Sequence, residues 1–369
     1  MNQAKLSVID ADAHVIENDH TWDFLEPSEA KYRPKKKIDP DVPDAHYWEV
    51  NGRRGPPALT VEATEDAIEK AEKVGRRIST PRNSRLMEDV GARLGHMDEL
   101  GIDIQVLHNT LFLYDMTEEP DGEAALTRSW NRWLAETWEM SDGRLPWSCL
   151  VPTRLLDEAK IQMRWAKEHG SVAVCLRPLE GERLITDPFF YPLLEEAERL
   201  DMSIAIHIAN GNAENVKLYG LRPGTHPAAG FGIFRVPTVA ACMYLILGDI
   251  STQFPDLRWG FIEASSQWIP WIHQEAARRL HAAGKEIPDS LFEANNIFVT
   301  CQVDEDIPWI MKYAGDNCLV IGTDYGHNDP SSDIDALGLL RDRDDIDAET
   351  KERILLRNPS TLFGIDLAA

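Results

Sequence analysis

Eight short apolar segments recur along the chain, and each is followed by a stretch in which apolar residues have helical spacing. The segments cover residues 8–17, 102–109, 145–152, 171–178, 202–209, 257–264, 296–301 and 318–324. Parallel strands that are covered on both faces are apolar in this way, and a regular alternation of strand and helix is what a (β/α)₈ barrel requires. We therefore predict an α/β fold of this kind. A doubly wound sheet is the alternative, but no Gly-rich phosphate loop favours it.

The chain has 369 residues, which suits a single barrel with an insertion. Residues 18–85 interrupt the alternation and are rich in proline, glycine and charge, with too few apolar residues for a core of their own. We expect one domain over residues 1–369. Within it, residues 18–85 should form an arm over the C-terminal face of the barrel, with one short helix in 61–73.

Composition excludes several classes of partner. Acidic residues outnumber basic ones by 62 to 38, a net charge of −24, whereas nucleic acids and anionic membranes require a basic surface. The five cysteines form no C-x-x-C pair, which indicates buried free thiols in a reducing compartment. No stretch resembles a signal peptide or a membrane span. We expect a cytoplasmic protein that acts on a small molecule.

Polar side chains gather at the predicted C-terminal ends of the strands. Alternation along the first segment, "VIDADAHVIE", places Asp10, Asp12 and His14 on one face of the strand. The other strand ends carry His108, Asn109, Arg177, His207, Glu263, Cys301, Gln302, Asp324, Tyr325 and His327. Barrel active sites are assembled at this rim. Burying so many ionisable groups together is costly unless a metal or a substrate compensates them.

Asp12, His14, His207 and Asp324 would form a mixed oxygen and nitrogen ligand set. Residues two apart in a strand are about 6–7 Å apart at Cα, so Asp12 and His14 can reach one ion. Because no thiolate is included, a divalent ion is favoured, with zinc first and manganese as the alternative. One coordination position would remain for substrate or water.

Several motifs resemble those of the amidohydrolase-related family that includes the aminocarboxymuconate-semialdehyde and γ-resorcylate decarboxylases. They are D-x-H in the first strand, "IAIHIAN", "FPDLRWGFIEASSQWIPW" and "LVIGTDYGHND", and the resemblance extends from residue 7 to about 360. It implies a metal-dependent barrel with the ion held by Asp12, His14, His207 and Asp324. Two positions depart from the family: Asp12 stands where relatives carry Glu or His, and Glu263 where many carry a histidine.

Two activities are compatible with this site. In non-oxidative decarboxylation the metal chelates a small aromatic or unsaturated carboxylic acid, and an acid protonates the carbon that loses CO₂. In hydrolysis of a small amide, lactone or C–C bond, a metal-bound water attacks, with Asp324 available as its base. Glu263 serves either reaction. A third alternative is a barrel that lacks catalysis and serves as a binding scaffold.

Further roles follow for residues outside the ligand set. His327 is expected to act in the active site, as an acid or as a partner of a ligand. Arg177 either clamps a substrate carboxylate or pairs with an acidic neighbour, which could be Glu263. His108 is a candidate for substrate binding. From the tryptophan-rich helices, the arm at 18–85 and the habits of the family, we expect a homodimer or larger homo-oligomer.

Overall fold

The computed structural model describes residues 7–40, 46–58, 65–219, 228–328 and 331–366. Eight parallel strands form one sheet in chain order. They are β1 (Ile9–His14), β5 (Ile104–His108), β6 (Trp147–Cys149), β7 (Ser171–Leu176), β10 (Ser203–His207), β11 (Trp259–Ile262), β12 (Ile297–Cys301) and β13 (Leu319–Ile321). The Asp324 amide donates to the Asp12 carbonyl and the His14 amide to the Tyr325 carbonyl, both at 2.9 Å. These bonds join the last strand to the first, so the predicted barrel is confirmed and the doubly wound alternative is wrong.

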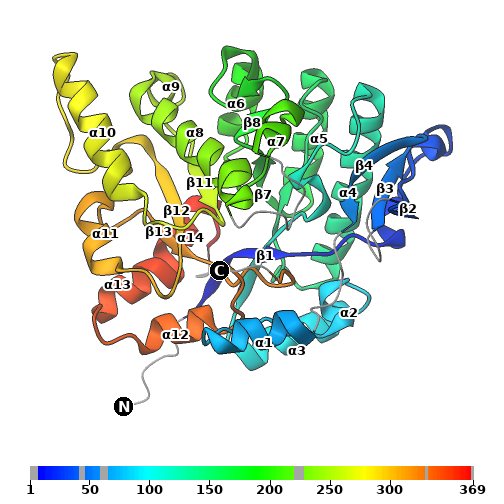
Figure 1. Cartoon of the computed structure of the whole chain (residues 1–369), viewed down its shortest axis with the longest axis horizontal. Helices are drawn as coiled ribbons and strands as arrows, with labels where there is room; N and C mark the ends of the chain where they lie inside the picture. The colour runs from blue at the N-terminus through cyan, green and yellow to red at the C-terminus, as the bar shows by residue number, and fades with distance from the viewer. Residues whose placement is uncertain (1–6, 41–45, 59–64, 220–227, 329–330, 367–369) are drawn as a thin grey trace.

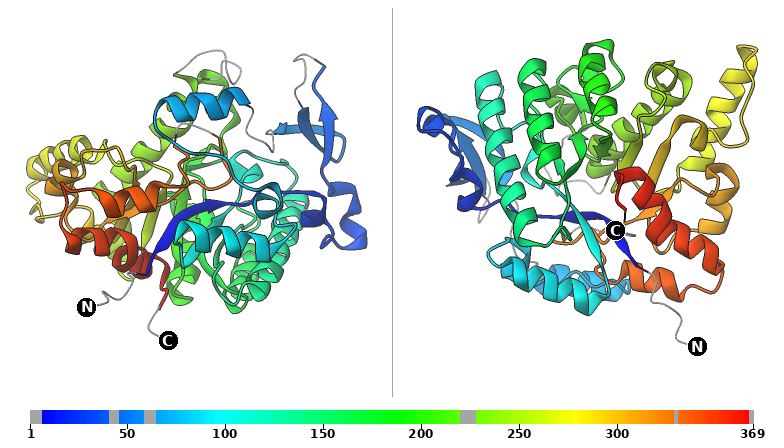
Figure 2. Two further views of the ribbon diagram at one scale, coloured as in Figure 1. Left: turned by 90° about the horizontal axis from the view of Figure 1, so that it is seen from below. Right: turned by 180° about the vertical axis from the view of Figure 1, so that it is seen from behind.

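Helices surround the strands (Figure 1; Figure 2, right). They are α2 (Arg82–Arg85), α3 (Val90–Leu100), α4 (Pro120–Met140), α5 (Leu156–Glu168), α6 (Tyr191–Arg199), α7 (Ala213–Tyr219), α8 (Val236–Leu247), α9 (Ile250–Gln253), α10 (Ile269–Ala282), α11 (Ile307–Ala314), α12 (Ala336–Asp342), α13 (Ala348–Glu352) and α14 (Asn358–Phe363). Local signals explain their ends. The Asp89 side chain caps α3 by accepting from the Ala92 amide, and α3 ends before Gly101, whose φ is +70°.

The core has an inner and an outer part. Small and branched side chains from alternate strand positions fill the barrel interior, among them Ile9, Ala11 and Val106. Larger side chains lie between strands and helices, including Trp130 and Trp133 of α4, which are at most 1% exposed. The tryptophan stripe on α4 is therefore packed within this chain.

A bulge in β1 corrects one prediction. The register against β5 shifts between Asp10 and Ala13, so the side chains no longer alternate strictly. Asp12 and His14 point into the barrel, but Asp10 points outward, where its carboxylate accepts hydrogen bonds from Thr323 and Gln105. Asp10 does not share the face of Asp12 and His14, because the bulge adds one residue to the period of two. Burial raises the pKa of Asp10 to about 6 despite these hydrogen bonds.

The segment 18–85 is divided between two locations. The strands β2 (Lys35–Ile38), β3 (His46–Val50) and β4 (Arg53–Ala58) form an antiparallel sheet beside the barrel, on the side of α4 (Figure 2, left). Helix α1 (Glu65–Lys73) occupies the described part of the predicted 61–73 helix. The end of the segment reaches the rim of the barrel, where Arg76 pairs with Asp304 at 3.0 Å. Trp48 of β3 lines a cavity together with Thr110 and Leu111, which follow β5. Residues 41–45 and 59–64 lie outside the described residues.

The cysteines and the helices concern two predictions made from composition. All five cysteines are buried and have free thiols. Among the described residues, every helix is too short or too polar to cross a membrane.

Candidate metal centre and active site

Five ionisable side chains meet at the C-terminal ends of the strands. Asp12 and His14 come from β1, His207 ends β10, and Glu263 and Asp324 follow β11 and β13; each is at most 3% exposed. His14 Nε2 lies 3.1 Å from His207 Nε2 and 3.4 Å from carboxylate oxygens of Asp12 and Asp324. His207 Nε2 lies 3.6 Å from Asp12 Oδ1 and 3.8 Å from Glu263 Oε2. The fold thus brings the four predicted ligands together, in two groups that share His14.

The hydrogen bonds of the two histidines fit a cation at this place. We assign Nδ1–H of His14 as donor to the Asn109 carbonyl at 2.8 Å and Nδ1–H of His207 as donor to the Ile208 carbonyl at 3.3 Å. Each Nε2 then carries a lone pair, and the two lone pairs repel at 3.1 Å unless a positive charge lies beside them. Asp12 Oδ1 is buried and accepts no hydrogen bond from a described residue. These are the protonation states that a divalent ion requires of its ligands.

The electrostatics of the cluster favour the same states. Burial opposes ionisation of Asp12, but the imidazoles of His14 and His207 outweigh it and hold the pKa of Asp12 well below its usual range. Burial, and next the neighbouring His327 ring, lower the pKa of His14 well below 6.5. An ionised Asp12 beside a neutral His14 is ready to bind a metal ion.

Backbone geometry holds two of the carboxylates in place. Glu263 and Asp324 adopt left-handed conformations with φ of +55° and +51°. Residues with side chains rarely adopt this conformation, and it is found mostly at functional sites. Gly322 allows the close approach of β13 to β1, because a Cβ there would lie 2.2 Å from Asp12 Cβ and 2.7 Å from the Asp12 amide nitrogen.

Gly322→Ala is therefore expected to displace Asp12. We expect metal affinity to fall by about 10- to 100-fold, as when a residue that orients a ligand is lost, and stability to fall by about 1–3 kcal/mol through overpacking. Gly95→Ala is the matched control, because a Cβ at residue 95 meets nothing within 4 Å in the interior of α3. Metal titration and urea unfolding of both variants test this. Wild-type metal affinity in the Gly322 variant would contradict it.

His327 forms the link between the ligands and the second strand of the barrel. Its Nδ1 lies 2.8 Å from Asp324 Oδ1, and its ring stacks on that of His14 with centroids 3.7 Å apart. Its Nε2 lies 2.9 Å from the Thr110 hydroxyl, whose own hydrogen goes to the Val15 carbonyl at 2.8 Å. Because the Thr110 hydrogen is already donated, Nε2 of His327 carries a hydrogen, and its Nδ1 faces the Asp324 carboxylate.

Glu263 lies where an acid or base is needed. One carboxyl oxygen faces the ligand imidazoles, at 3.8 Å from His207 Nε2 and 4.0 Å from His14 Nε2. The other accepts from the Ser331 hydroxyl at 3.0 Å, and the Glu263 carbonyl accepts from the Arg235 guanidinium at 2.5 Å. Asp324 is held similarly, since its second oxygen accepts from Ser332 at 2.6 Å.

Arg177 and His108 occupy places that favour structural roles. The Arg177 guanidinium pairs with Asp115 at 2.7 Å and with Glu180 at 2.5 Å, so the acidic neighbour expected for it is not Glu263. His108 is fully buried, with Nδ1 2.9 Å from the Ser148 hydroxyl and Nε2 3.2 Å from the Ala11 carbonyl. A substrate contact at either residue would have to displace these protein partners.

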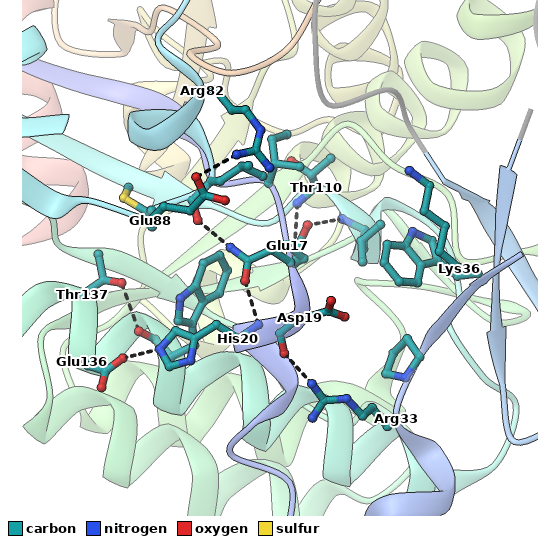
Figure 3. Close-up of a pocket in the computed structure, with 18 of the residues that line it drawn as sticks. Glu17, Asp19, His20, Arg33, Lys36, Arg82, Glu88, Thr110, Glu136 and Thr137 are labelled. Atoms are coloured by element: carbon teal, nitrogen blue, oxygen red, sulfur yellow. Dashed lines mark hydrogen bonds and ion pairs between the residues drawn. The ribbon is translucent and has the colours of Figure 1, made fainter. Parts of the chain in front are cut away.

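Two cavities are candidates for the active site. The larger, about 1140 Å³, lies between the arm and α4 (Figure 3). Several of its charges are paired locally: His20 pairs with Glu136 at 2.8 Å and Arg82 with Glu88 at 3.0 Å. The smaller, about 730 Å³, is lined by Glu263 and His327. We place the active site in the smaller cavity, because it reaches the ligand cluster.

Sequence reasoning missed several residues of the site. Arg235, Ser331 and Ser332 lie in helices or loops far from the strand ends that drew attention, and no local pattern marks them. Gly322 was detectable in principle, because a glycine two residues before a predicted ligand indicates close backbone approach.

A closed (β/α)₈ barrel with two aspartates and two histidines at the C-terminal rim defines a metal-dependent barrel enzyme. The amidohydrolase family model matches residues 9–365, and the chain belongs to this family of enzymes. The resemblance found in the sequence motifs is thereby confirmed, and with it a divalent-metal site.

Solved structures share the fold over most of the chain. An amidohydrolase from Mycobacterium avium subsp. paratuberculosis superposes with a TM-score of 0.79 at 16% identity and covers 100% of both chains. 5-Carboxyvanillate decarboxylase from Sphingomonas paucimobilis gives 0.67 at 17% identity, covering 98% of this chain and 100% of its own. The enzyme of that name from Novosphingobium aromaticivorans, complexed with manganese and 4-hydroxy-3-methoxy-5-nitrobenzoic acid, gives 0.60 at 19%, covering 82% and 94%. At 16–19% sequence identity, these superpositions show a common fold.

Proposed function

We propose that the enzyme catalyses the non-oxidative decarboxylation of a small aromatic or unsaturated carboxylic acid. The observation that carries this proposal is the position of Glu263. Its carboxyl group lies beside the ligand histidines and lines a cavity that is also lined by apolar residues such as Leu113 and Phe234. A flat acid fits such a cavity, and a protonated carboxyl group there can deliver a proton to carbon. The two 5-carboxyvanillate decarboxylases among the structural relatives support the same reaction class.

The metal ligands and Glu263 have distinct proposed roles in the reaction. Asp12, His14, His207 and Asp324 hold the ion, for which we propose zinc, with manganese as the alternative. When bound, the ion supplies positive charge for the oxygens of the acid and for the charge that develops as CO₂ leaves. The bond from the ring carbon to the carboxylate breaks, its electron pair stays on the ring carbon, and that carbon takes the proton of Glu263. A proton from water then restores the Glu263 carboxyl group.

Hydrolysis is the second candidate, and the geometry supports it less. It needs a base for the attacking water, and Asp324 was the residue expected to provide one. One oxygen of Asp324 accepts from the Ser332 hydroxyl at 2.6 Å, and the other lies 2.8 Å from His327 Nδ1, so little room is left at Asp324 for a water. Glu263 would have to take that role in its ionised form.

An assay distinguishes the two reactions. Protein loaded with zinc or manganese is incubated with hydroxybenzoates and, separately, with small lactones and amides. CO₂ release from the acids, without acid production from the lactones and amides, is expected. The reverse result would replace decarboxylation with hydrolysis.

We also propose that the enzyme is a homodimer or larger homo-oligomer. The tryptophans of α4 are used inside the chain, so the support comes from elsewhere. Tyr244, Trp271 and Trp309 are 60, 59 and 42% exposed on α8, α10 and α11, and α10 contacts both of the other helices. Exposed aromatic side chains of this kind are enriched in subunit interfaces. Light scattering at micromolar concentration should give at least twice the chain mass, and Trp271→Asp should lower it. A monomer mass for the wild type would refute the proposal.

A further inference from the structure

The active-site cavity contains an arginine that lacks an acidic partner. Arg76 and Arg235 both line the cavity, and Arg76 pairs with Asp304 at 3.0 Å. No carboxylate of a described residue lies within ion-pair distance of Arg235. Arg154 and Arg177, nearby, each pair with two carboxylates.

Arg235 is also held in position. It ends a π-helical turn, Phe231–Arg235, that leads into α8. Such turns are rare and occur frequently at functional sites. One guanidinium nitrogen donates to the Glu263 carbonyl at 2.5 Å. A guanidinium has five N–H donors in a planar fork, so donors remain for a carboxylate to bind in bidentate fashion.

The surroundings of Arg235 are those of a binding site for a ring. Tyr114, Phe231 and Phe234 line the same cavity, and the rings of Tyr114 and Phe234 meet edge to face with centroids 5.7 Å apart. Glu263 contacts Arg235 through its carbonyl and faces the ligand histidines through its carboxyl group. Glu263 thus contacts both Arg235 and the ligand histidines, which places the guanidinium and the proposed metal ligands at the same cavity.

We propose that Arg235 binds a second anionic group of the substrate, so that the enzyme selects a planar acid with two acidic groups. One carboxylate lies at the metal ligands and the other group pairs with Arg235, with the ring against Tyr114 and Phe234. Charge makes this assignment specific. The net field of the chain repels a dianion, and Asp12 and Asp324 add negative charge to the site, so a local cation is needed to attract it. This inference rests on the proposed function.

Equilibrium binding tests the inference independently of turnover. Isophthalate and benzoate are titrated by calorimetry into the manganese-loaded chain, and wild type should bind isophthalate more tightly. Arg235→Met should reduce isophthalate affinity by about 10- to 100-fold, the range expected for a lost charge-assisted pair, and leave benzoate affinity unchanged. Arg235→Lys retains the charge without the fork and should show a smaller loss.

Arg76→Met is the matched control, because it removes one positive charge from the same cavity. We expect it to lower isophthalate affinity by less than about threefold, since the Arg76 charge is already paired. Equal losses in the two methionine variants would mean that net charge, and not contact with Arg235, attracts the ligand. Equal loss of isophthalate and benzoate binding in the Arg235 variant would mean that Arg235 only supports Glu263. Either result overturns the proposal, as does a wild type without preference for isophthalate.

Failure of the proposed decarboxylation and failure of the proposed role of Arg235 give different experimental results. If no acid releases CO₂ but the Arg235 variant loses its preference for isophthalate, decarboxylation is wrong and the role of Arg235 stands. If CO₂ is released and the preference survives in the variant, the reaction stands and the role of Arg235 is wrong. Metal content and melting temperature of every variant should match wild type, which separates binding effects from unfolding.

Discussion

Replacing His207 with alanine should empty the metal site while the barrel stays folded. Wild type is expected to carry about one divalent ion per chain, because four ligands converge on one place. His207 supplies one of two imidazole nitrogens that lie 3.1 Å apart and face the two aspartates. Loss of a residue that only orients a ligand costs roughly 10- to 100-fold in metal affinity, so loss of a ligand should cost more. Elemental analysis after dialysis measures it, and activity should disappear with the ion.

A second histidine provides the control. His273 lies on α10 and packs edge to face against Tyr313, far from the ligands in sequence and on an outer helix. His273→Ala should keep its metal. Full occupancy in the His207 variant, with circular dichroism showing an intact fold, would remove His207 from the ligand set.

Glu263→Gln should keep the metal and lose most turnover. The amide preserves the shape of the side chain but cannot donate an acidic proton to carbon or take one back. General acid–base help is typically worth 10²–10⁴-fold in rate, so kcat should fall within that range. Because the Glu263 carboxyl group lies 3.8 Å from His207 Nε2 but outside the proposed ligand set, metal content should not change. The measurement is single-turnover CO₂ release by protein of known metal content.

Glu180→Gln separates catalysis from stability. Glu180 is a buried carboxylate that pairs with Arg177, outside the active-site cavity. Breaking this pair should cost stability, although less than the roughly 3–5 kcal/mol of a fully unpaired buried charge, because Arg177 keeps Asp115 at 2.7 Å. Each folded molecule should turn over normally. If the Glu263 variant behaves in this way, with a lowered melting temperature and normal turnover per folded molecule, its role is structural.

The sequence was sufficient to predict the barrel and the convergence of its proposed ligands, because both follow from strands. Strands in a closed parallel barrel are apolar along their length and polar at one end, so their positions alone predict that Asp12, His14, His207 and Asp324 meet at the rim. The prediction failed at Asp10, because a bulge changes the period of side chains and leaves no mark in a single sequence. The position of the whole arm over the rim stays a prediction, since residues 41–45 and 59–64 lie outside the described residues; the β2–β4 sheet itself lies beside α4.

Contacts between distant segments could not be predicted from the sequence, for a related reason. Whether Arg177 meets a substrate or Glu180 depends on a turn three residues long that the strand pattern does not describe. Arg235 enters the cavity through a π-helical turn, which hydrophobic spacing cannot distinguish from an ordinary helix. The positions of residues in loops depend on tertiary packing. Packing involves segments that are distant in the sequence, so a local pattern does not reveal these positions.

The closure of the barrel has a consequence for folding. The hydrogen bonds that join β13 to β1 are made by the backbone of residues that we propose as metal ligands, since the Asp324 amide donates to the Asp12 carbonyl. During synthesis the first two ligands emerge early and the last one near the end of the chain, so the site cannot exist before the barrel has closed. Ion binding and closure are then linked equilibria, and each stabilises the other. A cell that limits the metal would accumulate chains whose first and last strands separate more readily.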